Sequence, residues 1–148
     1  MNFDSIDIHG LLPQKEPFVF VSRILSFQET DIETEYTVRE SCPLVENGVL
    51  CREGLIEVMA QSNAARIGYI AKYILNIPVE IGFIGDIRGF RATRSPLVGE
   101  TLRTRVNLLG EIGGLAKVYA EITDKDGEII ASATMKTALK HEKDDEGL

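Results

Sequence analysis

The alternation of polar and apolar residues predicts strands on both sides of one long helix. Asp31–Val38 alternates residue by residue, as a half-buried strand does, and Val19–Phe27 is apolar and β-branched enough to form a strand that pairs with it. After Pro78 the pattern again has a period of two. Four more strands are expected at Glu80–Phe90, Glu100–Leu109, Leu115–Thr123 and Glu128–Leu139.

The longest predicted helix runs from Arg52 to about Ile74. Its apolar residues leave little of the circumference polar, which is typical of a buried helix; they are Leu55, Ile56, Val58, Met59, Ala60, Ala64, Ile67 and Ile70. A loop with Asn47-Gly48 precedes it, and a short helix is expected at Ser5–Leu12. A sheet wrapped around one apolar helix is the simplest α+β arrangement. The open edges of such a sheet favour a homodimer in which the sheet continues.

The overall composition limits the class of protein. The 148 residues fit one domain, expected at 1–140, and the charged end at 141–148 is expected to be a solvated, mobile tail. Lys and Arg total 16 against 23 Asp and Glu, and the net charge of −7 argues against nucleic acid as a partner. No apolar stretch reaches about 18 residues, so no membrane span is expected.

The two cysteines, Cys42 and Cys51, have no Cys or His companions at the spacing of metal ligands, so no metal site is expected. They are best interpreted as reduced thiols of a cytoplasmic protein. The start of the chain shows no basic segment followed by an apolar run, so no signal peptide is expected.

Glu57 is the leading catalytic candidate, because it is the acid in the first turns of the helix that should be most buried. A carboxylate among apolar neighbours holds its proton more tightly than one in water, which suits general acid or base catalysis. Gln61 lies one turn further along the same face and is expected to orient Glu57 or a ligand. The alternative is a structural carboxylate that caps the helix or pairs with Arg52.

The start of this helix is a second candidate site. Cys51, Arg52 and Glu53 include no good side-chain cap, and Gly54 opens the backbone further. The free N–H groups there would suit a thioester oxygen that gains negative charge. Water, or a turn around Asn47-Gly48, would satisfy them equally well.

A cationic run, Arg88, Arg91 and Arg94, is a third candidate. An acidic carrier protein or the phosphate of phosphopantetheine would suit this run despite the negative total charge. For any single arginine of the run, a solvated strand face is the more common role.

Several motifs in collinear order resemble the 3-hydroxyacyl-(acyl-carrier-protein) dehydratases, over about residues 6–139. The opening Leu12-Pro13 to Arg23 is similar to the family's "LPHRYPFLLVDR", and Glu57-Val58-Met59-Ala60-Gln61 is similar to its "EAMAQ". Phe90-Arg91 with Pro96 to Glu100 resembles "RFRKPVVPGD". The Met-Ala-Gln helix and Ile81-Gly82-Phe83 resemble, more closely, the divergent dehydratase-like proteins of aryl-polyene and flexirubin pigment clusters.

The resemblance implies a dimeric hotdog fold and a substrate carried on phosphopantetheine, with no cofactor of the protein's own. It also implies that Glu57 is the acid that helps the β-hydroxyl leave as water, while a histidine of the other subunit removes the α-proton. That histidine is expected near Pro43, where this chain has none, and the "LPH" histidine is replaced by Gln14. Cys42 is the residue that a one-residue shift would bring to the histidine's place, although a lone cysteine is more often a buried apolar residue.

Three functions follow from these observations. The first is dehydration of 3-hydroxyacyl thioesters bound to acyl carrier protein, in fatty-acid-like or polyene biosynthesis. The second is a thioesterase in which Glu57 activates water, acting on acyl-carrier or acyl-CoA substrates. The third is a non-catalytic acyl-binding subunit of a hetero-oligomer with an active hotdog dehydratase, which explains the missing histidine most simply.

Overall fold

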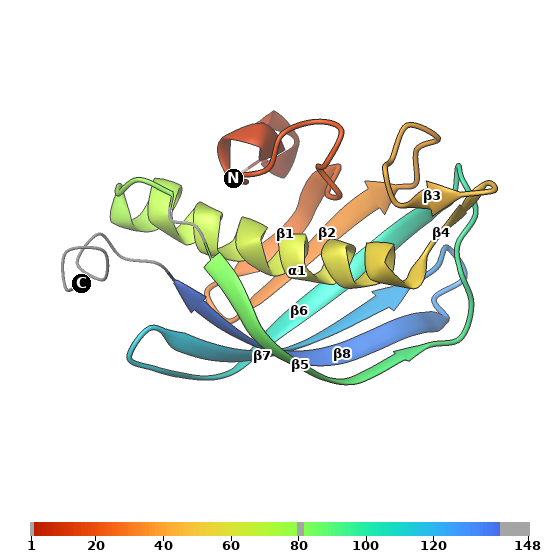
Figure 1. Ribbon diagram of the computed structural model, residues 1–148. Helices are drawn as coiled ribbons and strands as arrows, with labels where there is room; N and C mark the ends of the chain where they lie inside the picture. The colour runs from red at the N-terminus through yellow and green to blue at the C-terminus, as the bar shows by residue number, and fades with distance from the viewer. Residues whose placement is uncertain (1, 80–81, 140–148) are drawn as a thin grey trace.

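One curved sheet and one long helix make up most of the molecule. The computed structural model describes residues 2–79 and 82–139. The sheet order is β1-β2-β6-β7-β8-β5 with antiparallel neighbours throughout, and helix α1 lies across one face of the sheet (Figure 1). This is the α+β hotdog arrangement that the sequence predicts. The strands are β1 (Arg23–Gln28), β2 (Asp31–Thr37), β5 (Gly82–Ala92), β6 (Thr101–Ile112), β7 (Leu115–Thr123) and β8 (Ile129–Leu139).

The first strand is shorter than predicted. Strand β1 begins at Arg23, whereas the apolar pattern begins at Val19. Residues 19–21 are buried, but the Phe20 N–H donates to the side chain of Gln61 on the helix and not to a neighbouring strand. Hydrophobic burial alone therefore produced the strand-like pattern. The predicted start of the next long strand, Glu80, lies outside the described residues.

The helix expected at Ser5–Leu12 is absent, and this prediction is wrong. Two short 3-10 helices stand in its place, η1 (Phe3–Ser5) and η2 (Ile8–Gly10). The Asn2 side chain accepts from the N–H of Asp4, and the Asp7 side chain accepts from the N–H of His9, each at 3.0 Å. Each cap starts its own turn, so a single helix does not form.

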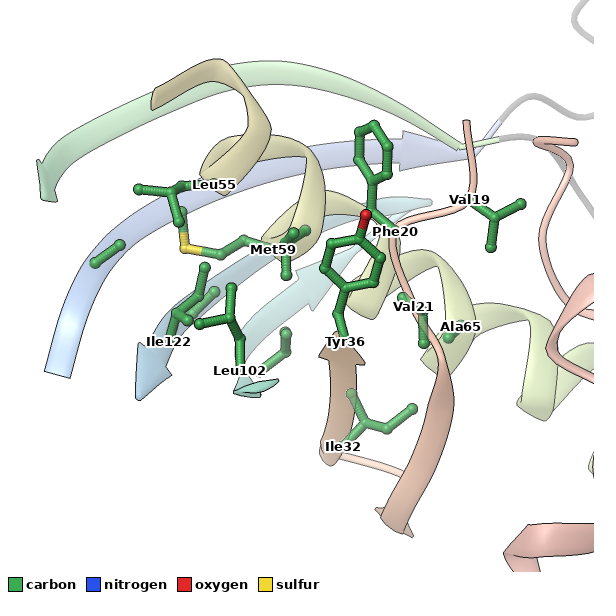
Figure 2. Close-up of a cluster of buried hydrophobic side chains, with 14 of the residues drawn as sticks. Val19, Phe20, Val21, Ile32, Tyr36, Leu55, Met59, Ala65, Leu102 and Ile122 are labelled. Atoms are coloured by element: carbon green, nitrogen blue, oxygen red, sulfur yellow. The ribbon is translucent and has the colours of Figure 1, made fainter. Parts of the chain in front are cut away.

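The core lies between α1 (Arg52–Tyr69) and the inner face of the sheet. Apolar side chains of the helix, among them Leu55 and Met59, meet Ile32, Leu102 and Ile122, all with no exposed surface (Figure 2). The helix continues as a π-helical segment, η3 (Ile70–Leu75), and ends at Asn76 in the left-handed conformation. The long helix predicted from Arg52 to about Ile74 is thereby confirmed.

Several polar residues of α1 are also buried, which the apolar pattern did not predict. The Ser62 hydroxyl donates to the carbonyl of Val58 and contacts the hydroxyl of Thr34, both at 2.7 Å. Arg66, 3% exposed, donates to Asn63 (3.1 Å) and to the carbonyl of Glu29 (2.9 Å), and burial lowers the pKa of its guanidinium. Because these groups are hydrogen-bonded, their burial is tolerated.

A small hairpin stands before the helix, where only a loop was expected. Its strands are β3 (Val45–Glu46) and β4 (Val49–Leu50). Asn47 (φ 53°) and Gly48 (φ 79°) form its two-residue turn, the pair of positive φ angles that such hairpins favour. The hairpin leads directly into α1 and so fixes where the helix begins.

Candidate active site

Glu57 lies in the second turn of α1, close to the amino-terminal end of the helix, which follows β4. Its side chain is half-buried, and its Oε2 accepts a hydrogen bond from Gln61 Nε2 at 3.1 Å. The i, i+4 spacing places the two side chains side by side on the helix, as the sequence predicts. The structure therefore brings the predicted acid and its predicted orienting partner together.

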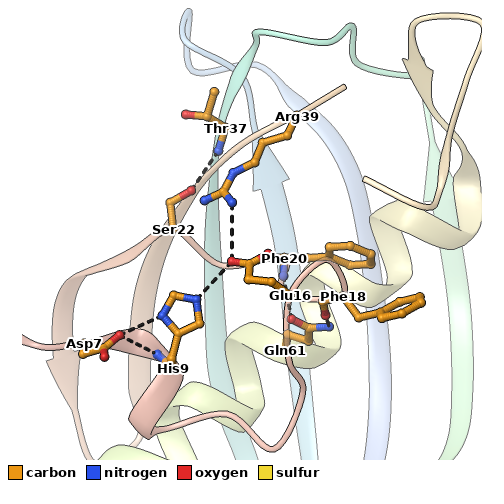
Figure 3. Close-up of polar contacts among 9 residues, drawn as sticks. All are labelled: Asp7, His9, Glu16, Phe18, Phe20, Ser22, Thr37, Arg39 and Gln61. Atoms are coloured by element: carbon orange, nitrogen blue, oxygen red, sulfur yellow. Dashed lines mark hydrogen bonds and ion pairs between the residues drawn. The ribbon is translucent and has the colours of Figure 1, made fainter. Parts of the chain in front are cut away.

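Gln61 is the best-connected side chain of the candidate site. It is 2% exposed, and its Oε1 accepts from the N–H of Phe20 at 2.7 Å. Its Nε2 donates to the carbonyl of Phe18 at 2.9 Å as well as to Glu57 (Figure 3). Because the oxygen must face an N–H and the nitrogen a carbonyl, the orientation of the amide is fixed.

Within residues 2–79 and 82–139, Glu57 is paired with no cation. Arg52, the alternative partner considered above, lies over the ring of Phe90 with 5.4 Å between its guanidinium carbon and the ring centroid. Among the residues that the structure describes, no ion pair involves Glu57 and no hydrogen bond reaches its Oε1. One carboxylate oxygen is thus fixed by Gln61 while the other can meet a ligand.

The start of α1 has no side-chain cap, as predicted, since Cys51 makes no capping hydrogen bond. Some of the backbone N–H groups in the first turn of α1 nevertheless have hydrogen-bond acceptors within the chain. The Gly54 N–H donates to the Cys51 carbonyl at 3.0 Å. The backbone N–H of Glu53 donates to the Glu53 carboxylate, and this hydrogen bond is the main cause that lowers the pKa of Glu53. Gly54 also packs tightly on Leu50, because a β-carbon at Gly54 would lie 2.7 Å from Leu50 Cγ. The role of Gly54 in substrate binding stays a prediction.

Cys42 lies in the segment before the hairpin and is 5% exposed. Its thiol contacts the hydroxyl of Tyr36, and burial first, then this contact, raises the pKa of Tyr36. No hydrogen bond joins Cys42 to Glu57 within the described part of the chain. Its catalytic role stays a prediction, but its surroundings are those of a buried apolar residue.

The three arginines of the cationic run do not share one environment. Arg94 forms two hydrogen bonds to Glu100 (2.8 and 2.9 Å) and one to Asp124 (3.1 Å), so it anchors a loop. Arg88 pairs with Asp86 at 2.7 Å, and Arg91 is exposed. Arg88 and Arg91 remain candidates for binding an anionic partner.

The structure places two lysines near Arg88 that were not predicted as site residues. Lys117 of β7 stands directly opposite Lys136 of β8, and Arg88 of β5 stands opposite Thr134, two residues from Lys136. Asp86, Arg88, Lys117, Thr134 and Lys136 line a hollow of about 210 Å³ on the outer face of the sheet. We call Arg88, Arg91, Lys117 and Lys136 the basic surface. Alternation along β7 and β8 places both lysines outward, but only the register makes them neighbours.

On the half of the outer face formed by β1, β2 and β6, two arginines form ion pairs with acids. Arg23 pairs with Glu35 and Asp4, and Arg105 pairs with Asp31 and Glu33. Like charges directly opposite each other destabilise a strand pair, so the Lys117–Lys136 pair carries a cost that this half avoids. The basic surface is therefore a candidate for binding an anionic partner.

Metal-binding clusters and membrane-spanning helices were the two remaining features to consider. Among residues 2–79 and 82–139, no three His, Cys, Asp or Glu side chains gather as a metal site would require. In the same residues, no helix has the length and apolar character needed to cross a membrane.

Comparison with known proteins agrees with this geometry. The model of the ApeP-like family, described as ApeP dehydratase, matches residues 6–146. The chain belongs to the ApeP-like dehydratase family. It is 29% identical over 148 residues to the 3-hydroxyacyl-[acyl-carrier-protein] dehydratase FabZ of Proteus mirabilis, covering 92% of this chain and 93% of that one. The FabZ of Vibrio parahaemolyticus is 26% identical over 146 residues, with 90% and 91% covered.

Solved structures show the same fold. The dehydratase heterocomplex ApeI:P from Xenorhabdus doucetiae contains a chain that matches with a TM-score of 0.87, 19% identity and 96% of both chains covered. A hypothetical thioesterase with coenzyme A from Streptococcus pneumoniae matches with a TM-score of 0.63 and 12% identity, over 79% of this chain and 84% of that one. The ApeP-like dehydratases are thus hotdog proteins, and the resemblance drawn from the sequence motifs is confirmed.

Proposed function

We propose that this protein takes part in the dehydration of 3-hydroxyacyl thioesters carried by an acyl carrier protein, with Glu57 as the acid. The observation that carries the proposal is the state of this carboxyl group. It is half-buried, fixed through one oxygen by Gln61, and paired with no cation among the described residues. Such a group is placed to give a proton to a leaving hydroxyl.

The reaction requires a base as well. Removal of the α-proton and departure of the β-hydroxyl as water leave a 2-enoyl thioester, and the thioester oxygen carries negative charge on the way. The start of α1, where the helix dipole is positive, suits that oxygen. Glu57 protonates the hydroxyl, so a second group must take the α-proton.

We infer that a second hotdog subunit supplies this base. Cys42 is buried against Tyr36, and neither His9 nor any other described residue places an imidazole beside Glu57. Strand β5 is an edge of the sheet and its main chain offers a pairing surface to another chain. A heterocomplex is the assembly named for the similar Xenorhabdus doucetiae structure. Among the described residues a homodimer would add only a second His9, which contacts Asp7 and Glu16, so we favour a hetero-oligomer.

The first experiment measures the product directly. The protein, alone and together with a histidine-bearing hotdog dehydratase subunit that co-purifies with it, is given an acyl carrier protein loaded with a 3-hydroxyacyl chain. Mass spectrometry of the carrier then reports the loss of one water molecule. We expect turnover by the complex and at least a hundredfold decrease for Glu57→Gln, since a general acid contributes about 10²–10⁴ in rate.

Glu128→Gln is the matched control, because Glu128 is an exposed acid in the β7–β8 turn and the substitution removes the same charge. Equal rates for Glu57→Gln and the wild-type complex would refute the role of Glu57. Release of free thiol without an enoyl product would instead identify a thioesterase. No cofactor of the protein's own is needed in the proposed reaction, and a cytoplasmic site of action is part of the proposal.

The basic surface is our candidate for the carrier's docking site. Four cations and one acid, Asp86, meet on this surface of a chain whose total charge is −7; the cations are Arg88, Arg91, Lys117 and Lys136. An acidic carrier protein complements the excess of positive charge. Docking there places the carrier against β5, whose Phe90 contacts Arg52 at the start of α1. Arg91, next to Phe90, is the part of the basic surface nearest that end of the helix, whereas Lys117 and Lys136 lie towards the β6–β7 hairpin at the other end of the sheet (Figure 1).

Reversal of one charge tests this docking site. Lys136→Glu should weaken carrier binding about tenfold or more at low salt, and the difference should shrink as the ionic strength rises. Arg105→Glu is unsuitable as a control because Arg105 is paired, so Lys125→Glu, an exposed lysine in the β7–β8 turn, serves instead. Identical affinities for wild type and Lys136→Glu would exclude this surface.

A further inference from the structure

The tip of the β6–β7 hairpin carries large apolar side chains that the fold leaves exposed. The exposed fractions are 57% for Leu109, 83% for Ile112 and 61% for Leu115. The turn is tight, because only Gly113 (φ 56°) and Gly114 (φ 84°) separate Ile112 from Leu115, and these last two residues are paired in the strand register. Exposed apolar groups gathered on an ordered hairpin mark a surface for contact with a protein or a membrane.

The apolar tip continues into the basic surface along one face of the sheet. Residues that pair across two strands point to the same face, so the side chains of Ile112 and Leu115 lie side by side. Lys117 follows Leu115 by two residues and lies on that face too, and Lys136 stands opposite Lys117. With a rise of about 3.4 Å per residue, the first lysine lies about 7 Å behind the tip. Cations therefore begin directly where the apolar side chains end.

Glu111, an acid of the same tip, lies on the opposite face. It pairs with Ala116 and so alternates with Ile112. Burial lowers the pKa of Arg66 on α1, and the charge of Glu111 opposes that shift, which agrees with a position on the helix side of the sheet. On the outer face Asp86 is already paired with Arg88 at 2.7 Å. The outer face behind the tip thus keeps an excess of positive charge.

A second exposed apolar group lies at the same end of the molecule. It belongs to η3 and the residues that follow, with side chains 38–57% exposed: Tyr73, Ile74, Leu75 and Ile77. Figure 1 shows the end of η3 and the β6–β7 hairpin at one end of the molecule. The strand register agrees, because Ala138 of β8 pairs with Leu115 on one side and with Phe83, near the start of β5, on the other. The two groups together enlarge the apolar area at this end.

We propose that this end of the molecule binds the surface of an anionic lipid bilayer, with Ile112 and Leu115 among the lipids and Lys117 and Lys136 at the headgroups. The order of charge favours a bilayer over a protein groove, because an apolar interior beneath an anionic surface complements an apolar tip followed by two lysines. Peripheral segments bury their apolar side about 5–10 Å deep, which matches the spacing from the tip to the first lysine. The inference goes beyond the proposed function and does not depend on Glu57.

Vesicle co-sedimentation of the full chain tests the proposal. The probes are vesicles of phosphatidylcholine alone and vesicles with equal parts of phosphatidylcholine and phosphatidylglycerol. We expect the wild type to bind the anionic vesicles about tenfold or more tightly than the neutral ones, since each lysine near the surface contributes about fivefold. This preference should shrink as the ionic strength rises.

Removal of the apolar tip should abolish most of the binding. The double variant Ile112→Ser, Leu115→Ser is expected to bind anionic vesicles about tenfold or more weakly than the wild type, because two apolar side chains no longer leave water. Lys117→Gln should weaken binding about fivefold on anionic vesicles and leave the neutral ones unaffected. Ile129→Ser is the matched control, since Ile129 is 51% exposed and begins β8 at the other end of the sheet. All four variants should melt close to the wild type, because the altered side chains are exposed.

Insertion of the tip can be observed directly. The chain contains no tryptophan, so Ile112→Trp adds a single fluorescent probe. On anionic vesicles its emission should move to shorter wavelength and be quenched by brominated lipids, whereas Ile129→Trp should show neither effect. An emission spectrum of Ile112→Trp that anionic vesicles leave unchanged would contradict insertion.

Three results of the sedimentation series would overturn the proposal: no binding of the wild type to anionic vesicles at low salt, equal binding by the double serine variant, or an equal loss in Ile129→Ser. If the wild type ignores vesicles and the double serine variant fails to assemble with a second subunit, the tip is a protein interface and the membrane proposal fails.

The lysines are shared with the candidate docking site of the carrier, so the apolar substitutions separate the two proposals. The double serine variant should lose vesicle binding and keep the affinity of the wild type for the carrier. Vesicle binding that depends on the tip, together with a Glu57→Gln complex as active as the wild-type complex, would refute the proposed function and leave the membrane contact standing.

Discussion

At the scale of single residues, the glycine at position 68 lets the amino-terminal segment pack closely on the helix. The carbonyl group of Leu11 rests directly on α1 at Gly68, and a β-carbon there would overlap its oxygen. Leu11 is itself completely buried. Glycine is therefore required at position 68 because the Leu11 backbone packs against it, and not because of its φ angle.

Gly68→Ala should destabilise the protein by about 1–3 kcal/mol through overpacking. The sign is informative, because Gly→Ala within a helix ordinarily stabilises by about 1 kcal/mol. Urea unfolding followed by circular dichroism measures the difference. Gly110→Ala is the control, since nothing lies within 4 Å of a β-carbon at Gly110 in β6. A Gly68→Ala variant as stable as the wild type would show that the segment simply moves away.

The residues of the candidate site were predictable only where they are close in sequence. Glu57 and Gln61 are four residues apart on one helix, so their pairing follows from helix geometry. The other two hydrogen bonds of Gln61 join residues 41 and 43 positions apart, and no local pattern contains that information. The contact of the Phe18 carbonyl with Gln61 could not be predicted because it depends on where the segment before β1 packs on the helix.

At the scale of elements, the loop between β5 and β6 shows how ion pairs replace regular structure. Arg94 bridges Glu100 and Asp124, and the Leu97 N–H donates to Glu100 at 2.6 Å. The Arg94 guanidinium is the main cause that lowers the pKa of both carboxyl groups. The loop is thereby fastened to the β7–β8 turn.

Arg94→Ala should lower the free energy of unfolding by about 1–2 kcal/mol at neutral pH, less than a fully buried pair would lose, because Arg94 is 39% exposed. Thermal unfolding measures this loss. Arg94→Lys keeps the charge but cannot form the paired hydrogen bonds of the guanidinium to Glu100, so its stability should lie between those of the wild type and Arg94→Ala. The opposite ranking, with lysine worse than alanine, would refute these paired hydrogen bonds as the source of the stability.

Elements with a clear period were predicted well, and those fixed by caps and tertiary contacts were not. The bounds of β7 are the predicted ones, and α1 begins at the predicted residue. The short helix at the amino terminus failed because Asn2 and Asp7 each cap a separate turn. The β3–β4 hairpin had a local signal in Asn47-Gly48, but its strands of two residues each are too short to show a period.

At the scale of the whole molecule, three segments meet at His9. Its ring nitrogens contact Asp7 (2.8 Å) and Glu16 (3.0 Å), and Glu16 also contacts Arg39, while Lys72 lies near Asp7. The hydrogen bond to Glu16, followed by that to Asp7, raises the pKa of His9. Fold class was predictable from periodicity, but this junction joins parts of the chain that only the tertiary structure brings together.

The stability that His9 contributes should depend on pH. Because its pKa is raised in the folded state, the contribution is complete below the ordinary histidine pKa of about 6.5 and is lost as the pH rises through the folded value. Wild type should therefore exceed His9→Gln in urea midpoint at pH 5.5, and the two should converge by pH 9. A difference that grows with pH would contradict the assignment.

Two contacts of the amino-terminal segment with α1 bear on the smallest fragment that can fold. The Leu11 carbonyl packs on Gly68, and the Gln61 side chain forms hydrogen bonds with the backbone of Phe18 and Phe20. Regular strands begin only at Arg23, yet a fragment cut there would lose the cover over α1 and the backbone groups that orient the Gln61 amide. Trimming to the first strand, a common choice when domain limits are drawn, should yield an insoluble product. The autonomous unit includes its irregular leading segment.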